Sequence, residues 1–291
     1  IEMETGWMHR GMEKLCEQKT FDQAMFAVER ICGICSTSHP LAHAHALEDV
    51  DKIQIPERAK YIRTLIGELE RLHSHLLWLG LAGHFIGYDT LWMWAWKYRE
   101  PVLELMEMIS GNRNHYGMIR PGGVRRDVDD SLLPLINEKL DPIKGKMDMI
   151  AKAAGDDPVL QSRLKGVGAL SREAAIDYGA VGPTARASGV DIDVRRDEPM
   201  AAYDMIDFNV ITMKNGDVYD KLVVRVLEVV ESIKIVEQVT AKLKVVQGPY
   251  YIDIKEITPG QGIGRYEAPR GEVIHYVRTD GTNRSVRHKV R

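Results

Sequence analysis

The sequence predicts a mainly α protein with small α+β portions, built around a bundle of long helices. Apolar residues recur at helical spacing over several long stretches of the first half. Alternation of apolar and polar residues, which is typical of strands, begins only after residue 189, and another long helical pattern follows it. The 291 residues are 44% hydrophobic and 28% charged, which is typical of a globular protein with a substantial core.

The first half of the chain is expected to be helical. Helices are predicted at residues 9–18 and 22–34, the second with Asp22 as its N-cap. The next helix is expected to begin at Pro56, whose fixed φ suits a first helical turn. Its apolar positions keep a three- and four-residue spacing for about six turns; they are Ala59, Ile62, Ile66, Leu69, Leu72 and Leu76.

One apolar stretch has the length of a membrane span. Residues 76–96 could cross about 30 Å of hydrocarbon, but they include Asp89 and three glycines. An aspartate in mid-span costs several kcal/mol, and glycines weaken a continuous helix. We therefore interpret the stretch as two buried helices that meet at a glycine-rich elbow. The second helix is predicted to continue through residues 92–109.

The rest of the chain is predicted to mix elements. A loop is expected around Arg120 and Gly123, and the expected helices are at residues 130–154, 171–178 and 222–243. Strands are predicted at residues 190–194, 206–210, 250–254 and 273–277. We divide the chain into a helical half, 1–165, and a mixed half, 166–291, which pack into one bundle.

Charge and cysteine content exclude several classes of protein. The formal net charge is −3, which argues against a nucleic-acid partner, and three cysteines cannot form a disulfide framework. The sequence begins at Ile1 and ends on a basic run at residues 287–291. We expect from this that both ends are truncated.

The cysteine pair Cys32 and Cys35 is the sharpest chemical feature. Two thiolates three residues apart can hold one metal ion, and the intervening Gly33 lets the backbone turn toward it. The spacing alone leaves half a zinc site, a redox dithiol or two inert cysteines open. A closed four-cysteine zinc site within the chain is excluded because there is no second C-x-x-C, and a helical context argues against a thioredoxin-like site.

The surrounding residues resemble the large subunits of [NiFe]-hydrogenases. Residues 30–39 are similar to that family's first cysteine motif, and residues 9–14 to its amino-terminal R-G-x-E element. Residues 111–115 and 119–124 have a form seen in the membrane-bound, energy-converting branch and also in the related quinone-site subunit of respiratory complex I. The cysteine pair favours a hydrogenase, because the complex I subunit lacks those cysteines. The other motifs that carry the resemblance are residues 181–183, 186–189 and 267–272.

The sequence also departs from this family. Its members hold nickel with four cysteines, and the second C-x-x-C pair is not in this sequence. We expect truncation to be the reason. The alternative is a homologue that has lost the metal, although the intact Cys32–Cys35 pair would then be a relic.

The resemblance implies roles for six residues. Cys32 and Cys35 would be nickel thiolates, with Cys35 bridging to iron, and Glu13 would relay protons. Arg270 would lie over the open face of the metal pair, with Asp89 either as its partner or as a helix N-cap. His39 would donate a hydrogen bond toward the bridging sulfur. For each of these residues, ordinary packing or pairing is the alternative interpretation.

The resemblance also implies a function, namely reversible reduction of two protons to H₂ coupled to ion translocation. The cofactor would be a Ni–Fe centre with CO and CN ligands on iron. Electrons would come from ferredoxin through an iron–sulfur cluster in a partner, because the chain lacks cysteines for one. The partners would be a small [4Fe–4S] subunit and ion-pumping membrane subunits, and the chain would lie peripherally on the cytoplasmic face of the membrane.

Two other functions stay open. A metal-free or altered homologue would bind quinone or another acceptor, as a complex I-like or sulfur-reducing subunit. A non-catalytic scaffold would use Cys32 and Cys35 to hold a structural zinc together with ligands from a partner.

Overall fold

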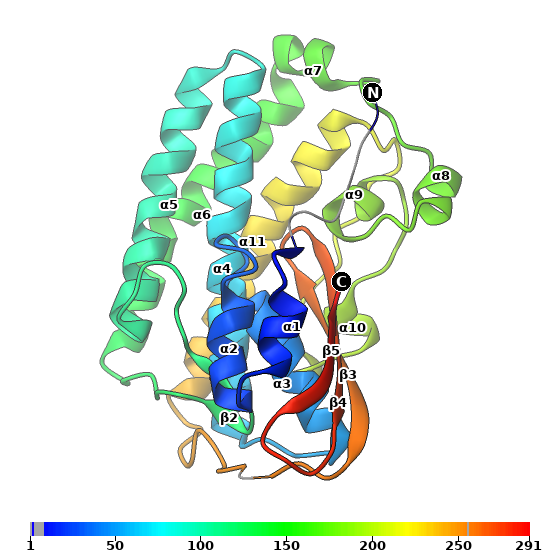
Figure 1. Ribbon diagram of the computed structural model, residues 1–291. Coiled ribbons are helices and arrows are strands. Elements are labelled where there is room, and N and C mark those ends of the chain that lie inside the picture. Colours follow the sequence, from blue (N-terminus) through cyan, green and yellow to red (C-terminus); the bar gives the residue numbers. More distant parts are fainter. Residues whose placement is uncertain (1, 3–8, 255) are drawn as a thin grey trace.

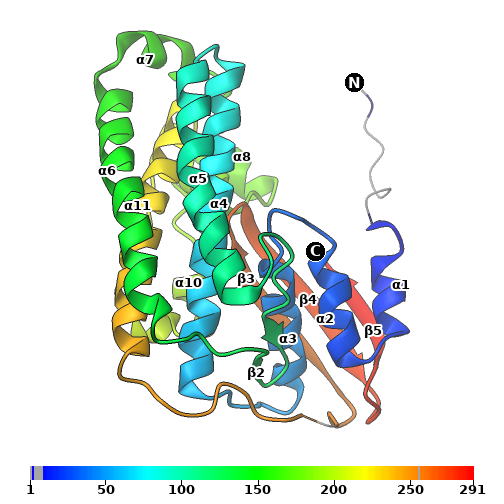
Figure 2. The ribbon, with the colours of Figure 1, turned by 90° about the vertical axis from the view of Figure 1, so that its left-hand side faces the viewer.

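The core of the computed structural model is a bundle of four long helices. They are α4 (Glu57–Phe85), α5 (Asp89–Ser110), α6 (Leu132–Asp156) and α11 (Val218–Leu243), which stand side by side in Figures 1 and 2. The structure describes residues 2, 9–254 and 256–291. The prediction of a mainly α fold with small mixed portions around long helices is confirmed.

Helix α4 lies at the centre of this bundle. Its predicted apolar stripe is fully buried, and the helix packs against both α5 and α11. Because neighbours cover it on several sides, charged residues such as Arg63, Glu68 and Arg71 are buried as well. Buried charges must be paired, and those on α4 bind side chains and carbonyl groups from distant parts of the chain.

The expected elbow joins α4 to α5. Helix α4 ends at Phe85 and α5 begins at Asp89, with Gly87 between them in the left-handed region at φ +76°. The interpretation of residues 76–96 as two helices is therefore confirmed. The expectation that both are buried is wrong near the elbow, where Phe85 and Met93 are exposed because no other element in the described part of the chain covers them. Among the residues that the structure describes, no helix is both long and apolar enough to cross a bilayer.

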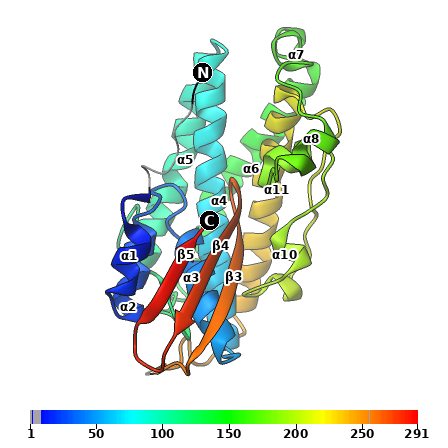
Figure 3. The same ribbon diagram turned by 45° about the vertical axis from the view of Figure 1, so that its right-hand side comes forward.

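A three-stranded antiparallel sheet lies beside the bundle. Its strands are β3 (Gly260–Ala268), β4 (Gly271–Thr279) and β5 (Ser285–Val290), in that order (Figure 3). Helix α3 (Ser38–Val50) packs on the sheet, and α1 (Met12–Glu17) lies along β5. A Cβ at Gly264 would clash with the Ala42 carbonyl of α3, so this glycine permits the close approach of helix and sheet.

The remaining elements are short and mostly connect the larger ones. Helix α2 (Phe21–Glu29) leads into the cysteine loop, and the hairpin of β1 (Ile119–Arg120) and β2 (Gly123–Val124) lies in the predicted loop. The others are α7 (Pro158–Leu164), α8 (Arg172–Asp177), α9 (Gly182–Ala187), α10 (Val194–Asp197) and a 3₁₀ turn at Tyr203–Met205.

Two predicted strands are wrong. Residues 190–193 and 206–210 form no strand, and α10 begins at Val194. In these segments, side-chain carboxylates accept the hydrogen bonds of backbone N–H groups that a neighbouring strand would otherwise accept. Asp193 accepts from the Arg195 N–H at 3.0 Å, and Glu231 accepts from the Asn209 N–H at 2.9 Å. Alternation alone does not distinguish such a segment from a strand.

Other expectations are corrected in detail. Residues 250–254 contribute one isolated bridge, between Gly123 and Tyr251, and 273–277 lie within β4 as predicted. The N-cap of α2 is Thr20 and not Asp22, because Thr20 and Gln23 form a reciprocal capping box. The division of the chain at residue 165 stays a prediction.

Candidate metal centre

Cys32 and Cys35 lie in a short loop between α2 and α3. The Cys35 N–H donates to the Cys32 Sγ at 3.2 Å, so the loop folds the two thiols toward each other. Cys35 is buried, and Cys32 is partly exposed. The third cysteine, Cys16, is buried in a separate cluster with Ala24 and Val28, so only the predicted pair is brought together.

Arg270 binds both sulfurs of the pair. Its Nη2 donates to Cys32 Sγ at 3.1 Å and to Cys35 Sγ at 3.2 Å. The structure thus brings Arg270 to the two thiols, and its expected position over the open face of a metal pair stays a prediction. A guanidinium stays charged under all ordinary conditions, so it brings a permanent positive charge to the sulfurs.

A tight turn between β3 and β4 delivers Arg270 to this position. Ala268 pairs with Gly271 in the ladder, which leaves Pro269 and Arg270 as the two residues of the turn. Gly182, at the start of α9, packs against the same turn. A Cβ on Gly182 would lie 2.5 Å from the Gly271 Cα, so these two glycines bring the 181–183 and 267–272 motifs into contact.

The two thiols titrate as a pair. The hydrogen bond from Cys35, helped by neighbouring backbone N–H groups and the Arg270 charge, lowers the pKa of Cys32 against the effect of burial. The same sulfur contact and burial raise the pKa of Cys35. The first thiolate therefore forms on Cys32, as expected for a cysteine beside a guanidinium.

Two side chains of α4, Glu70 and His73, hold the cysteine loop in place. Glu70 belongs to none of the motifs identified in the sequence. Glu70 accepts hydrogen bonds from the Thr37 and Ser38 backbone N–H groups and from the Ser38 hydroxyl. It thereby caps the N-terminus of α3, where Thr37 makes no side-chain cap. Burial raises the pKa of Glu70 to about 8.

His73 is the second support from α4. Its Nε2 donates to the Ile34 carbonyl at 3.1 Å, and its Nδ1 accepts from the Arg99 Nε at 3.0 Å. These two partners define the tautomer. His73 therefore anchors the loop between the two cysteines.

The loop before β1 covers the other side of the cysteines. The Ser36 hydroxyl lies 3.3 Å from Asn114 Oδ1 and 3.4 Å from His115 Nδ1. Gly33 faces the same two side chains. The motif at residues 111–115 is therefore in contact with the cysteine motif, although the two are about 80 positions apart in sequence.

Glu13 and His39 line one pocket of about 270 Å³ beside this site, together with His9, Met12, Ile31, Val290 and Arg291. Burial by itself raises the pKa of Glu13, but Lys289 at 3.0 Å and the Val290 N–H at 3.1 Å outweigh it and lower the pKa overall. The ion partner of Glu13 is Lys289. The carboxyl is thus ionised in this conformation, whereas a proton relay needs a pKa nearer neutrality.

His39 points its Nδ1 at His275, not at a sulfur. The Nδ1 lies 3.2 Å from His275 Nε2, and burial lowers the pKa of His39 to about 4. The ring is therefore neutral at pH 7. The expected hydrogen bond from His39 to the bridging sulfur stays a prediction.

Asp89 lies away from this arrangement. It is the first residue of α5, its side chain is 61% exposed, and it binds His84 Nδ1 at 2.9 Å. Asp89 therefore forms a hydrogen bond with His84 at the elbow in place of the expected pairing with Arg270, and the N-cap of α5 is Tyr88 and not Asp89. An aspartate at a helix start is also stabilised by the helix dipole, so it needs no buried cation.

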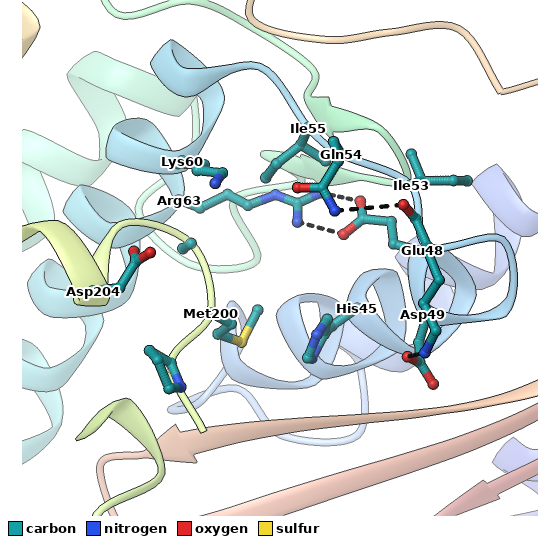
Figure 4. A pocket seen from close by; sticks show the side chains of 13 residues that line it. His45, Glu48, Asp49, Ile53, Gln54, Ile55, Lys60, Arg63, Met200 and Asp204 are labelled. Carbon is teal, nitrogen blue, oxygen red and sulfur yellow. Dashed lines mark hydrogen bonds and ion pairs between the residues drawn. The ribbon is translucent and has the colours of Figure 1, made fainter. Parts of the chain in front are cut away.

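The motif at residues 119–124 forms a separate anchored loop. Glu48 accepts from the Gly122 N–H at 2.8 Å, and Arg63, which is ion-paired to Glu48, donates to the Gly123 carbonyl. This ion pair lines the pocket in Figure 4, into which His45, Lys60 and Asp204 also point. The pocket contains neither cysteine.

The ligands available at the cysteine site limit which metal ions it can hold on its own. Cys32 and Cys35 supply two adjacent soft ligands, as nickel and iron prefer. No third histidine, cysteine or carboxylate joins them within ligand distance among the described residues. The described residues thus offer two sulfur ligands, with Arg270 beside them.

Comparison with known proteins reveals the relationship behind these motifs. Residues 86–262 match the family "respiratory-chain NADH dehydrogenase, 49 Kd subunit", and residues 10–81 match the nickel-dependent hydrogenase family. Over 306 residues the chain is 39% identical to the membrane-bound hydrogenase subunit alpha of Pyrococcus furiosus, covering all of this chain and 72% of that protein. The chain belongs to this hydrogenase and 49 Kd subunit family.

Other similar proteins belong to several kinds of oxidoreductase. An NADH-quinone oxidoreductase subunit of Rhizobium etli is 36% identical, over all of this chain and 79% of that protein. The carbon monoxide-induced hydrogenase of Rhodospirillum rubrum is 34% identical, over all of this chain and 81% of that protein. A chain in the structure of the membrane-bound sulfane sulfur reductase, an archaeal respiratory membrane complex, superimposes with a TM-score of 0.91 at 30% identity, over 98% of this chain and 79% of that one. Relatives of this chain are thus oxidoreductase subunits of membrane complexes.

Proposed function

We propose that the chain is the catalytic subunit of an energy-converting [NiFe]-hydrogenase, which interconverts H₂ with two protons and two electrons. The observation that carries this proposal is the Arg270 guanidinium, which binds both sulfurs of the Cys32–Cys35 pair. A site for a complex I-like subunit has no need of two thiols brought together under a guanidinium. The names of two relatives, in P. furiosus and R. rubrum, agree with this interpretation.

Cys32 and Cys35 would hold the Ni–Fe centre, which supplies the two-electron chemistry of H₂ when bound. Thiolates are required for this, and the lowered pKa of Cys32 favours the first of them. Arg270 would keep a positive charge at the open side of the site without losing a proton. The loop is kept in shape by Glu70 and His73, so the two sulfurs are positioned before any metal arrives.

Proton movement is assigned to Glu13. It lines the same pocket as His39, next to the cysteine loop. Its ion pair with Lys289 would have to loosen for the carboxyl to take up a proton, since that contact and the Val290 N–H hold the ionised form.

The partners are proposed from the same family relationship. A small [4Fe–4S] subunit would deliver electrons from ferredoxin, and membrane subunits would pump ions. The chain would be bound peripherally at the cytoplasmic face of the membrane.

A second function has its own support. The chain is 36% identical to a subunit of NADH-quinone oxidoreductase and superimposes on a chain of a sulfane sulfur reductase. In that case the site passes electrons to another acceptor, or only couples conformational changes.

Metal analysis of the native complex separates these functions. The hydrogenase hypothesis predicts close to one nickel per chain and one iron beyond the iron of the partner's clusters, together with H₂/D⁺ exchange. Replacing Cys35→Ser should remove nickel and exchange, whereas Cys16→Ala, in the separate buried cluster, should keep both. Zinc bound to the cysteines in place of nickel would support a scaffold, and absence of nickel from an active complex would support the second function.

A further inference from the structure

Four histidines gather between α3 and the sheet, outside the cysteine loop. His43 lies on α3, His275 on β4 and His288 on β5, and all three have no exposed surface. His39, one turn before His43, contacts His275 from the cysteine side. Imidazoles are rarely packed together in a dry interior, because each carries a donor and an acceptor that need partners.

These rings are close enough to share one ion. One ring nitrogen from each of His43, His275 and His288 lies within 4.8 Å of the other two. The closest pair, His275 Nδ1 and His288 Nε2, is 2.9 Å apart. Three nitrogens around a zinc ion at 2.0–2.1 Å are separated by about 3.4 Å, so small ring rotations suffice to form the site.

The hydrogen bonds of the cluster are incomplete without an ion. Both nitrogens of the His43 ring and the Nδ1 of His288 are buried without a protein partner. An unpaired buried polar group costs about 1–3 kcal/mol, and His43 would bear that cost at both nitrogens. Burial lowers the pKa of all three histidines, to about 4 for His288, so their lone pairs are available at neutral pH.

We propose that His43, His275 and His288 form a structural zinc site that fastens α3 to strands β4 and β5. Imidazole nitrogens in a small tetrahedral set suit Zn²⁺, and a water or a fourth side chain would complete it. With zinc on its Nδ1, His275 would carry its proton on Nε2 and donate it to His39 Nδ1, which lies 3.2 Å away.

The charges around the cluster are compatible with a cation. Helix α1 brings two carboxylates close by, since Glu17 accepts from the His288 N–H and Glu13 accepts from the Val290 N–H of β5. Both carboxylates act on His288 with a negative field. Arg270 is the opposing positive charge, and it acts on His39, which lies on the cysteine side of the cluster.

Zinc binding can be tested apart from hydrogenase activity, because the proposal does not rest on it. The background is the full chain with Cys32→Ser and Cys35→Ser, so that added Zn²⁺ cannot bind thiolates. We expect one zinc per chain and an X-ray absorption spectrum with imidazole nitrogens at about 2.0 Å and no sulfur shell. Zinc should also raise the thermal unfolding midpoint.

Variants in this background assign the ligands. His43→Gln and His288→Gln should each weaken zinc binding by at least about 100-fold and abolish the zinc-dependent shift in midpoint. His45→Gln, on the same helix but outside the cluster, is the control and should bind zinc like the background. If a ligand variant fails to fold, the absorption spectrum of the background alone decides. A folded background that binds no stoichiometric zinc, or ligand variants with unchanged affinity, would overturn the proposal and leave a metal-free chain of imidazoles.

Discussion

At the scale of single residues, the surroundings of each side chain decide its chemistry. Cys16 and Cys32 are both thiols, but burial near Glu13 and Glu17 raises the pKa of Cys16 to about 11, whereas a second thiol and Arg270 lower that of Cys32. The two carboxyl groups of Glu13 and Glu70 also have pKa values that shift in opposite directions. The partly exposed Glu13 is held ionised by Lys289, and burial raises the pKa of Glu70.

The first prediction concerns Glu13. In the metal-loaded complex, Glu13→Gln should lower H₂/D⁺ exchange at least about tenfold, because an amide keeps the hydrogen bond to Val290 but cannot carry a proton. Nickel content should stay unchanged. Glu107→Gln, on an exposed position of α5, is the control. Exchange at the wild-type rate in Glu13→Gln would remove the assigned role.

The second prediction concerns His75 and the pH dependence of stability. Burial lowers the pKa of His75 to about 4 in the folded protein, although Glu228 at 2.6 Å opposes the shift. In the unfolded chain His75 therefore binds a proton near pH 6.5, whereas in the folded chain it binds one only near pH 4. Stability from this group is complete above pH 6.5 and falls by about 3 kcal/mol as the pH drops to 4.

Denaturant unfolding at several pH values measures this dependence. His75→Gln should flatten the loss of stability between pH 6.5 and pH 4 relative to the wild type, even if it lowers stability overall. If the unfolding free energy falls equally steeply between pH 6.5 and pH 4 in both proteins, His75 does not contribute to the pH dependence.

At the scale of elements, close backbone approaches depend on glycine. The 119–124 loop packs Gly122 against the Ile252 carbonyl and Gly123 against Tyr250, and Glu48 and Arg63 bind the same loop from two helices. The geometry of this turn is thus enforced by contacts from elsewhere in the chain. A sequence pattern identifies the turn but not what packs on it.

The third prediction compares two left-handed glycines. Gly179→Ala, at φ +62° with open space around the new Cβ, should cost about 1–2 kcal/mol of unfolding free energy. Gly122→Ala, at φ +85°, adds a clash with the Ile252 carbonyl and should cost about 1–3 kcal/mol more. Equal losses for both variants in denaturant unfolding would contradict the packing in this loop.

At the scale of the whole molecule, buried ion pairs tie distant segments to the bundle. Glu228 of α11 binds Arg186 of α9 at 2.9 Å and His75 of α4. Arg186 also binds Glu267 at 2.8 Å, which joins two motifs that are 81 positions apart in sequence. Since β3 carries Glu267 and leads into the Arg270 turn, this network links the helical core to the cysteine site.

The fourth prediction follows from this network. Glu228→Gln removes one of the carboxylates that pair with the buried Arg186 and leaves Glu267 in place, so it should lower the unfolding free energy by about 1.5–3 kcal/mol. Glu104→Gln, which breaks an exposed pair with Lys139, should change stability little. Similar behaviour of the two variants in thermal unfolding would argue against a buried network.

The long helices could be predicted from the sequence because their apolar spacing is a local property. The elbow at Gly87, the stop at Gly111 and the start of α8 at Ser171 also follow from single residues. The predicted strands at 190–194 and 206–210 failed because apolar alternation also suits an extended segment whose backbone is bound by Asp193 and Glu231. Strand pairing is a contact between distant segments and leaves no local trace.

The sequence by itself determined the family and the helical core and singled out the two cysteines as candidate ligands, because motif order and spacing can be read along the chain. Only the tertiary structure showed that Arg270 binds the two sulfurs and that Asp89 contacts His84 in place of Arg270. It also brought His43, His275 and His288 together. The turn and the two strands follow one another in sequence, but they lie 235 positions or more from the cysteines and the helix residue that they contact. Their proximity depends on how the elements pack, which local spacing does not encode.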